Sequence, residues 1–343
     1  MRKDLIVAGL FFLPGIVFGV ALDRYWLLQS QQITGVGAAS TQPAGGGRPT
    51  VALDQFNMEN LKVSREEILS GGPRKDGIPS LSHVEVAAVG EADFLAEGDR
   101  MVGVTINGQS RAYPVNVLNY HEAVNDVVGG VPIAAIYCPL CDSVSIVDRR
   151  MGDKTLEFGI SGLLMNSNVL LYDQVDNALW SQVKLEAISG PFAGQSLTHL
   201  PFELTTFGQW KRGHPDGKVM TFNTGHRRDY HRNGYADRGY FATDEIWFPI
   251  SRHDDRMGVK ERVVGVRLGS VARAYPLAAI EAAPGHEIND EVGGQTIKLR
   301  ADGDGSGVTI VEAPKQAQVV HTFWFAWSAF HPETDIYGAA GGG

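Results

Sequence analysis

The sequence predicts a β-rich α+β fold: one large globular body with an internally duplicated unit of strand hairpin and short helix, preceded by one transmembrane helix. Three observations predict it. An apolar run follows the charged N-terminus, short alternating segments bounded by turn residues fill the body, and two motif blocks recur in the same order. The chain has 343 residues, of which 43% are hydrophobic, so it has ample material for a core.

The first 26 residues are typical of a membrane anchor. Arg2 and Lys3 precede an apolar run over residues 5–22, and Tyr25 and Trp26 follow it. The run is near the short limit for a membrane-spanning helix, the basic residues favour a cytoplasmic N-terminus, and the aromatic residues suit the headgroup region. A cleaved signal peptide is the alternative. The first interpretation predicts a single-pass protein of the cell membrane, and both place the body on the periplasmic or extracellular side.

Composition divides the remainder of the chain. Residues 27–50 are rich in Gln, Gly, Ala, Ser and Thr, which predicts a flexible linker. The globular body is expected over 51–337, and the glycine-rich residues 338–343 are expected to be a disordered tail. Within the body we expect repeat units at about 83–150 and 250–312, separated by a central strand-rich segment over 151–249.

The duplication is visible in two sets of motifs. Residues 111–114, Arg-Ala-Tyr-Pro, recur at 273–276, a spacing of 162 residues, and each copy follows a Val-Gly-Val segment. An Asn-Asp pair with a Gly-Gly turn, at 125–130, recurs at 289–294. Two matched blocks in the same order indicate a duplicated supersecondary unit and not a solenoid.

Each unit predicts the order strand, tight turn, strand, short helix, turn, strand. In the first unit Asn107-Gly108 is a hairpin turn, a short helix is expected over 117–124, and a buried strand over 133–137 leads to Cys138. A strand over 143–147 then runs back. The central segment adds strands over 156–160 and 168–172, and the aromatic residues of 323–330 have the spacing of a packing helix.

Charge and motifs exclude several function classes. The net charge of −9 argues against a general nucleic-acid binder, which carries a basic stripe. The sequence has no glycine-rich phosphate loop of the P-loop or dinucleotide-binding kind. The most basic and aromatic stretch, residues 226–240, is a candidate for binding a small molecule or an anion, with a solvated loop as the alternative. A protein partner is not indicated.

The two cysteines of the chain, Cys138 and Cys141, are the strongest functional signal. Their spacing lets both thiols reach one point, where they can share a metal ion or form one disulfide. In the second unit the corresponding loop is 302–307, which has Asp, Gly and Ser and no thiol, so the cysteines are a special feature of one loop.

A transition-metal site is the first interpretation of the pair. His121 is the expected third ligand, because it lies upstream in the same unit. A Cys/His set outside the cytoplasm suits copper better than zinc on grounds of softness, which predicts metal handling or metal-centred redox chemistry. Weaker candidates for ligands are Glu122, Met165, His226, His231 and His253.

Three alternatives to the metal site remain open. The pair is a redox candidate for thiol–disulfide exchange, although the strand expected after Cys141 differs from the helix that follows the motif in thioredoxin-like folds. One cysteine is a candidate nucleophile with His121 as base. Both cysteines are also compatible with buried structural residues. A non-catalytic binding module at residues 226–240 is the third function considered.

Several motifs together resemble a known family, the domain-of-unknown-function 3179 family of bacteria and archaea. The resemblance covers about residues 80–335. It implies an exported or membrane-anchored protein with a Cys-Pro-Leu-Cys motif, and it implies no activity. The motifs that carry the resemblance are His-Glu-x-x-Asn-Asp at 121–126, Tyr-Cys-Pro-Leu-Cys at 137–141, residues 158–164, Tyr172-Asp173, residues 179–182 and Ala-Tyr-Pro at 274–276.

Overall fold

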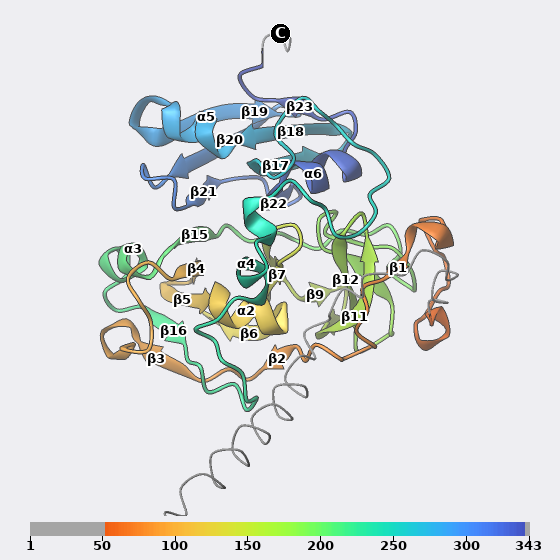
Figure 1. Cartoon of the computed structure of the whole chain (residues 1–343), viewed down its shortest axis with the longest axis horizontal. Helices are drawn as coiled ribbons and strands as arrows, with labels where there is room; N and C mark the ends of the chain where they lie inside the picture. The colour runs from red at the N-terminus through yellow and green to blue at the C-terminus, as the bar shows by residue number, and fades with distance from the viewer. Residues whose placement is uncertain (1–51, 340–343) are drawn as a thin grey trace, which may run out of the picture. The chain divides into compact units, whose positions relative to one another are not determined.

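Two eight-stranded sheets are the largest elements in the part of the chain that the computed structural model describes, residues 52–339 (Figure 1). The first sheet contains β3 (Val86–Ala88), β4 (Arg100–Ile106), β5 (Gln109–Pro114), β15 (Glu203–Thr206), β16 (Lys218–Met220), β19 (Glu287–Val292), β20 (Gln295–Ala301) and β21 (Val308–Glu312). The second contains β2 (Leu81–Ser82), β6 (Ala123–Val128), β7 (Val131–Cys138), β8 (Ser143–Asp148), β17 (Arg262–Leu268), β18 (Val271–Pro276), β22 (Gln318–Phe323) and β23 (Asp335–Ile336).

The order of strands shows that the two repeat units exchange parts. The first sheet has the order β19-β20-β21-β15-β4-β5-β16-β3, and the second β2-β6-β7-β8-β22-β17-β18-β23. The hairpin β4–β5 of the first unit therefore lies in one sheet, while the three strands β6–β8 that follow it extend the other sheet. The second unit does the reverse, because β17–β18 and β19–β21 lie in opposite sheets. The two units are thus interlocked.

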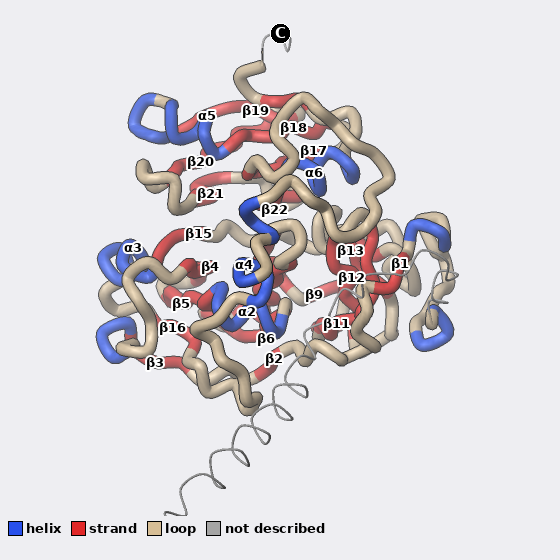
Figure 2. Tube along the Cα trace, in the orientation of Figure 1, coloured by secondary structure: helices blue, strands red, loops and turns tan. Residues whose placement is uncertain are grey.

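Five short helices lie among these strands in the described residues, and they are separated by much loop (Figure 2). They are α2 (Val115–His121), α3 (Phe207–Gly213), α4 (Gly234–Asp237), α5 (Leu277–Ala282) and α6 (Trp324–Phe330). The predicted packing helix over 323–330 is confirmed as α6. The helix expected over 117–124 begins two residues earlier and ends at Glu122, whose left-handed backbone (φ 58°) terminates it. The Gly129-Gly130 pair instead makes the turn between β6 and β7.

The repeated motifs have a structural explanation. Tyr113 and Arg111 both donate hydrogen bonds to Asp126 at 2.7 Å, and their counterparts Tyr275 and Arg273 bind Asp290 at 2.8 and 2.6 Å. In each unit the Tyr and Arg side chains thus link the hairpin in one sheet to the next strand of the chain, which lies in the other sheet. This contact requires Arg-Ala-Tyr-Pro and Asn-Asp together, which is why the two motifs recur as a set.

The Val-Gly-Val segments recur because each glycine faces an indole ring. A Cβ atom on Gly103 would lie 2.1 Å from Trp210 of α3, and one on Gly265 would lie 2.1 Å from Trp327 of α6. Each indole lies against a histidine one helical turn later, His214 and His331 respectively. Each repeat unit is therefore completed by a distant strand–helix–strand segment, β15-α3-β16 or β22-α6-β23.

The core lies where the two sheets contribute equivalent residues. One buried cluster contains Val102 and Val104 of β4 together with Val264 and Val266 of β17. Burial of these apolar side chains, at about 25 cal/mol per Å², is the main favourable term that holds the interlocked units together.

A third, five-stranded sheet covers the loop that carries the cysteines. Its order is β1-β11-β12-β13-β14. Residues of β11 and β12 share a buried cluster with Cys138 and Cys141. The strands are β1 (Leu69–Ser70), β11 (Phe158–Met165), β12 (Asn168–Asp173), β13 (Leu179–Ser181) and β14 (Glu186–Ala187), and a small two-stranded sheet adds β9 (Arg150–Met151) and β10 (Lys154–Thr155).

The predicted terminal segments lie outside the described residues. At the N-terminus these are the membrane anchor over 1–26 and the linker over 27–50, and at the C-terminus they are residues 340–343 of the predicted tail. Among residues 52–339, no helix combines the length and the apolar character needed to cross a membrane.

Candidate thiol site

Cys138 and Cys141 lie in a tight turn between β7 and β8. The N–H of Cys141 donates to the carbonyl oxygen of Cys138 at 3.2 Å, so the turn brings the two Cα atoms within about 7 Å. A disulfide needs Cα atoms about 4.4 to 6.8 Å apart, which this turn allows. Both cysteines are free thiols, with 1% and 0% of their surface exposed.

The two thiols have opposite electrostatic surroundings. Burial would raise the pKa of Cys138, but hydrogen bonds from the Cys141 side chain and from the backbone N–H groups of Val169, Cys141 and Leu140 bring it below its ordinary value. Burial raises the pKa of Cys141 well above its ordinary value, and the neighbouring Cys138 raises it further. The carbonyl oxygen of Ser167 lies 3.2 Å from the Cys141 sulfur and is a second acceptor for the one proton of that thiol. Cys138 is therefore the more acidic thiol of the pair, and Cys141 is the less acidic one.

Glu122 has a buried carboxyl group within electrostatic range of Cys138. Its left-handed backbone ends α2 and places its carbonyl oxygen 2.8 Å from the N–H of Tyr137, on the strand that leads to the cysteine. Only 6% of Glu122 is exposed. Burial raises its pKa well above the ordinary value, and the charge of Cys138 raises it further. Glu122 is therefore a buried carboxyl group that Cys138 influences electrostatically, and no hydrogen bond joins these two side chains in the described structure.

Asp142, the residue after Cys141, is held by two arginines. Arg100 of β4 and Arg262 of β17 donate to its carboxylate at 2.7 and 2.8 Å, and Tyr137 donates at 3.0 Å. Burial opposes the charge on Asp142, but the two guanidinium groups lower its pKa far below the ordinary range. The backbone oxygen of Asp142 accepts a bond from His321 at 3.0 Å. Asp142 is fully buried and has left-handed backbone, so this network fixes the shape of the turn.

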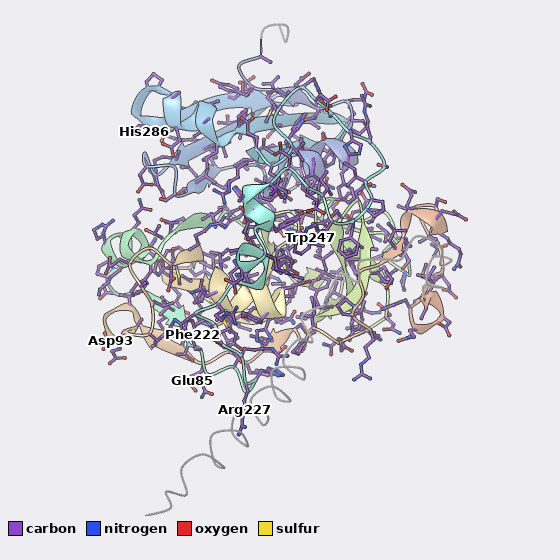
Figure 3. All side chains as sticks on the ribbon, viewed as in Figure 1. Glu85, Asp93, Phe222, Arg227, Trp247 and His286 are labelled. Atoms are coloured by element: carbon purple, nitrogen blue, oxygen red, sulfur yellow. The ribbon has the colours of Figure 1, made fainter. Side chains whose placement is uncertain are left out.

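An aromatic cover lies over the cysteine turn. We use "cover" for residues 230–248, which include α4. Tyr240 donates from its hydroxyl to the carbonyl oxygen of Leu140 at 2.6 Å, and its ring packs on Trp247 with centroids 4.4 Å apart. Tyr235 stacks on Trp247, and its pKa is raised first by burial and then by the charges of Glu122 and Cys138. The cover therefore excludes water from the thiols; Figure 3 labels Trp247 near the middle of the body.

His121 does not join the cysteines. Its Nδ1 bonds the carbonyl oxygen of Pro79 at 2.7 Å, so Nδ1 carries the proton, and Nε2 accepts from the hydroxyl of Tyr230 at 2.7 Å. Burial lowers the pKa of His121 to about 4. The lone pair expected to bind metal is thus already occupied, and Glu122, the neighbouring residue in the sequence, turns to Cys138 instead.

The weaker candidates lie apart from the thiols or face elsewhere. His226 lies beside His121, with ring centroids 5.2 Å apart, His231 lies against Phe222, and His253 is exposed. Met165 packs in a different buried cluster from the cysteines. Across residues 52–339 no group of three or more His, Cys, Asp or Glu side chains could hold a metal ion, so the expected set of Cys138, Cys141 and His121 does not form.

The basic and aromatic residues of 226–240 divide between two environments. Tyr230, Tyr235 and Tyr240 turn inward, whereas Arg227 projects from the loop (Figure 3). Arg232 is paired with Asp237 at 2.7 Å. The aromatic half of the stretch is therefore a packing element of the thiol site, and binding of an anion by its basic half stays a prediction.

Sequence reasoning missed the clamp on Asp142 and the paired helices. The signal for the clamp was present, because Arg100 and Arg262 are separated by the same 162 residues as the Arg-Ala-Tyr-Pro motifs. A second repeat, Trp-x-x-x-His-Pro at 210–215 and at 327–332, marks α3 and α6. No sequence motif indicated the position of Glu122 near Cys138, because this position depends on where α2 ends.

The fold and site together define a class: a β-rich protein with an interlocked duplication and a buried C-x-x-C thiol pair in one of its two equivalent turns. The family model described as Protein of unknown function (DUF3179) matches residues 75–321, and the chain belongs to this family. The resemblance inferred from the motifs is thereby confirmed. No curated protein and no solved structure matches the chain.

Proposed function

We propose that the protein carries out thiol–disulfide exchange at Cys138 and Cys141. The observation that carries this proposal is the turn that places two buried free thiols at a distance that permits a disulfide, with surroundings that lower the pKa of Cys138 and raise that of Cys141. Exchange uses both properties, because a thiolate is the nucleophile and the second thiol must stay protonated until the mixed disulfide has formed. A structural pair of small buried side chains would need neither property.

The proposed reaction has two steps. The Cys138 thiolate attacks one sulfur of a substrate disulfide, forms a mixed disulfide and releases the other substrate sulfur as a thiolate. Cys141 then loses its proton and attacks the sulfur of Cys138, which releases the second substrate thiolate and leaves a Cys138–Cys141 disulfide. Two electrons pass from the pair to the substrate, and each released thiolate takes up one proton.

Glu122 is the proposed proton carrier. As a protonated acid within electrostatic range of Cys138, it can give its proton to the first leaving thiolate. The resulting carboxylate can then accept the proton of Cys141 before the second step. The fixed Asp142 keeps the turn in place throughout, because its two arginine partners come from different repeat units.

Access to the thiols requires movement of the cover. Both sulfurs are buried, and Tyr240 is bonded to the turn itself. Substrate must therefore displace part of residues 230–248, which lie in the long segment between β16 and β17. That segment contains only α4 and one short 3-10 turn as regular helical structure, so its displacement leaves the sheets intact.

The test is thiol alkylation of the full chain by iodoacetamide as a function of pH, with single variants Cys138→Ser and Cys141→Ser. The proposal expects Cys138, left alone in Cys141→Ser, to react faster below pH 8 than Cys141 left alone in Cys138→Ser. Equal rates, with circular dichroism showing both variants folded, would remove the basis of the proposal. Metal analysis of the same wild-type sample tests the metal prediction directly: copper or zinc bound stoichiometrically and lost in both variants would replace exchange by metal binding.

A further inference from the structure

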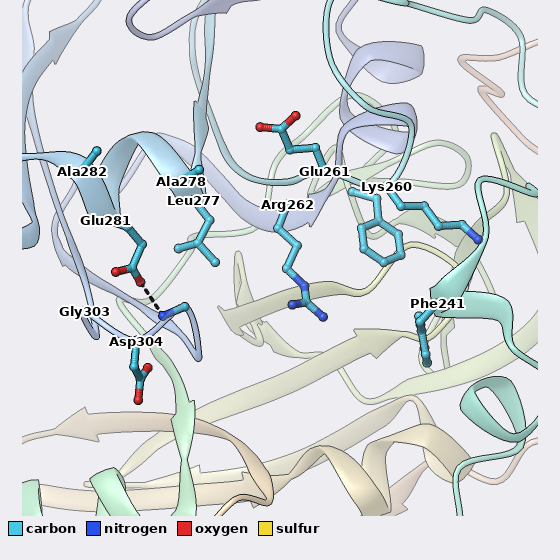
Figure 4. Close-up of a pocket in the computed structure, with 12 residues that line it drawn as sticks. Phe241, Lys260, Glu261, Arg262, Leu277, Ala278, Glu281, Ala282, Gly303 and Asp304 are labelled. Atoms are coloured by element: carbon cyan, nitrogen blue, oxygen red, sulfur yellow. Dashed lines mark hydrogen bonds between the residues drawn. The ribbon is translucent and has the colours of Figure 1, made fainter.

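A separate cavity lies beside α5, on the second repeat unit. Its volume is about 790 Å³, in the range of small-molecule sites. The walls come from α5, the β20–β21 turn, the start of β17, the end of β22 and Phe241 of the cover (Figure 4). In the first unit the corresponding turn is the cysteine turn, which the cover closes. The cavity is thus the open counterpart of the covered thiol site.

One side of the cavity is basic and aromatic. Lys260 and Arg262 line it together with Phe241 and Phe323, and the Lys260 ammonium group donates to the carbonyl oxygen of Tyr240 and lies over the ring of that residue. The Nε atom of Arg262 binds Asp142, but its two terminal nitrogens make no hydrogen bond to any residue in the described part of the chain. Asp142 offsets only one of the two guanidinium groups that it binds, so a positive charge remains at this side.

The other side of the cavity is acidic. Glu281 of α5 lines the cavity in Figure 4 and accepts a hydrogen bond from the N–H of Gly305 at 3.0 Å. This bond occupies one oxygen of the Glu281 carboxylate, and the carboxylate keeps its negative charge. Asp304 of the β20–β21 turn also lines the cavity, but its two oxygens accept from Gln209 and from the N–H of Ser306. Leu277 and Ala278 form an apolar surface between the two charged sides.

We propose that this cavity binds a short peptide with free ends. The carboxylate would bind the terminal nitrogens of Arg262, with the charge of Lys260 nearby, and the ammonium group would bind Glu281. The apolar surface and the two phenylalanines would contact side chains of the peptide. A single amino acid would fill only a small part of 790 Å³, which is why two or three residues are inferred. The proposal does not depend on the thiol chemistry.

Equilibrium dialysis tests the proposal. The full chain is dialysed against a pool of dipeptides and tripeptides, and the retained peptides are identified by mass spectrometry. The proposal expects retention by the wild type, a loss of at least tenfold in affinity when either end is blocked by acetylation or amidation, and a similar loss in Lys260→Ala and Glu281→Gln. Circular dichroism of each variant shows whether a loss of binding reflects a loss of fold.

Exposed charges away from the cavity provide matched controls. Lys315→Ala and Glu312→Gln remove the same types of charge from exposed positions, and both should retain peptides as the wild type does. Lack of retention by the wild type, or retention that is equal for blocked and free peptides, would overturn the proposal. Equal retention by the cavity variants and the controls would do the same. Since Cys138→Ser leaves the cavity unchanged, its peptide binding separates this proposal from the thiol mechanism.

Discussion

Arg100 and Arg262 occupy equivalent positions, as the first residues of β4 and β17, and both bind the single carboxylate of Asp142. The two repeat units therefore meet at the residue that follows the cysteine pair. Since Asp142 has no exposed surface and each arginine is partly exposed, the clamp both fixes the turn and joins the units.

Asp142→Asn should destabilise the protein by about 3 kcal/mol, because it leaves two guanidinium groups without their buried partner. Urea unfolding at pH 7 measures the change. Asp229→Asn, which removes a carboxylate from an exposed loop, is the control and should stay within about 0.5 kcal/mol of wild type. A change for Asp142→Asn no larger than that of the control would show that the clamp contributes little.

Gly103→Ala and Gly265→Ala should each destabilise the protein by about 1 to 3 kcal/mol, because each new methyl group would overlap an indole ring. Thermal unfolding of the two variants is the measurement. Gly90→Ala is the matched control, since nothing lies within 4 Å of the position that its new methyl group would occupy. If one glycine variant were as stable as the control, the two indole contacts would not be equivalent.

The stability of the fold should fall as the pH is lowered from about 6.5 to about 4. Burial lowers the pKa of both His121 and His321 to about 4, below the value of about 6.5 for an unfolded histidine. Between these values the unfolded chain binds more protons, so acid favours unfolding. His121→Gln should flatten this dependence when the melting temperature is followed across the range. An unchanged slope would mean that His121 is not neutral in the fold.

Glu122→Gln should keep the fold but slow the exchange reaction at least tenfold, because the amide cannot supply or accept the proton. The stability effect has a defined sign. A raised pKa means that the folded state retains a proton that the unfolded chain releases above about pH 4.3, so Glu122 weakens folding as the pH rises and the variant should be relatively more stable at pH 8. Wild-type exchange rates in a folded Glu122→Gln variant would exclude the proposed proton carrier.

Tyr240→Phe should increase the rate at which Cys138 reacts with alkylating agents, because it removes the bond from the cover to the Leu140 carbonyl oxygen. The expected increase is about fivefold, corresponding to about 1 kcal/mol for one hydrogen bond. Tyr337→Phe serves as the control at a distance from the turn. If Tyr240→Phe and the control react at the same rate, the cover does not limit access.

The sequence allowed much of the fold to be predicted but less of the site. Turn residues and alternating patterns identified the hairpin at Asn107-Gly108 and the strands on either side of the cysteines, because these depend on neighbouring residues. The exchange of strands between the two sheets could not be predicted, since a strand with one buried face pairs equally well in either sheet. The placement of Glu122 at Cys138, where His121 was expected, depends on a left-handed residue at the end of α2. Sequence proximity alone therefore identified the wrong neighbour.

The redox equilibrium of the cysteine pair tests the central claim most directly. The full chain would be equilibrated with mixtures of reduced and oxidised dithiothreitol, quenched with acid and alkylated, and its mass would report how many thiols remain. Thiol–disulfide exchange predicts a reversible transition between two free thiols and none, abolished in Cys138→Ser and in Cys141→Ser. Two thiols that remain reduced in every mixture, in a folded protein, would contradict the claim.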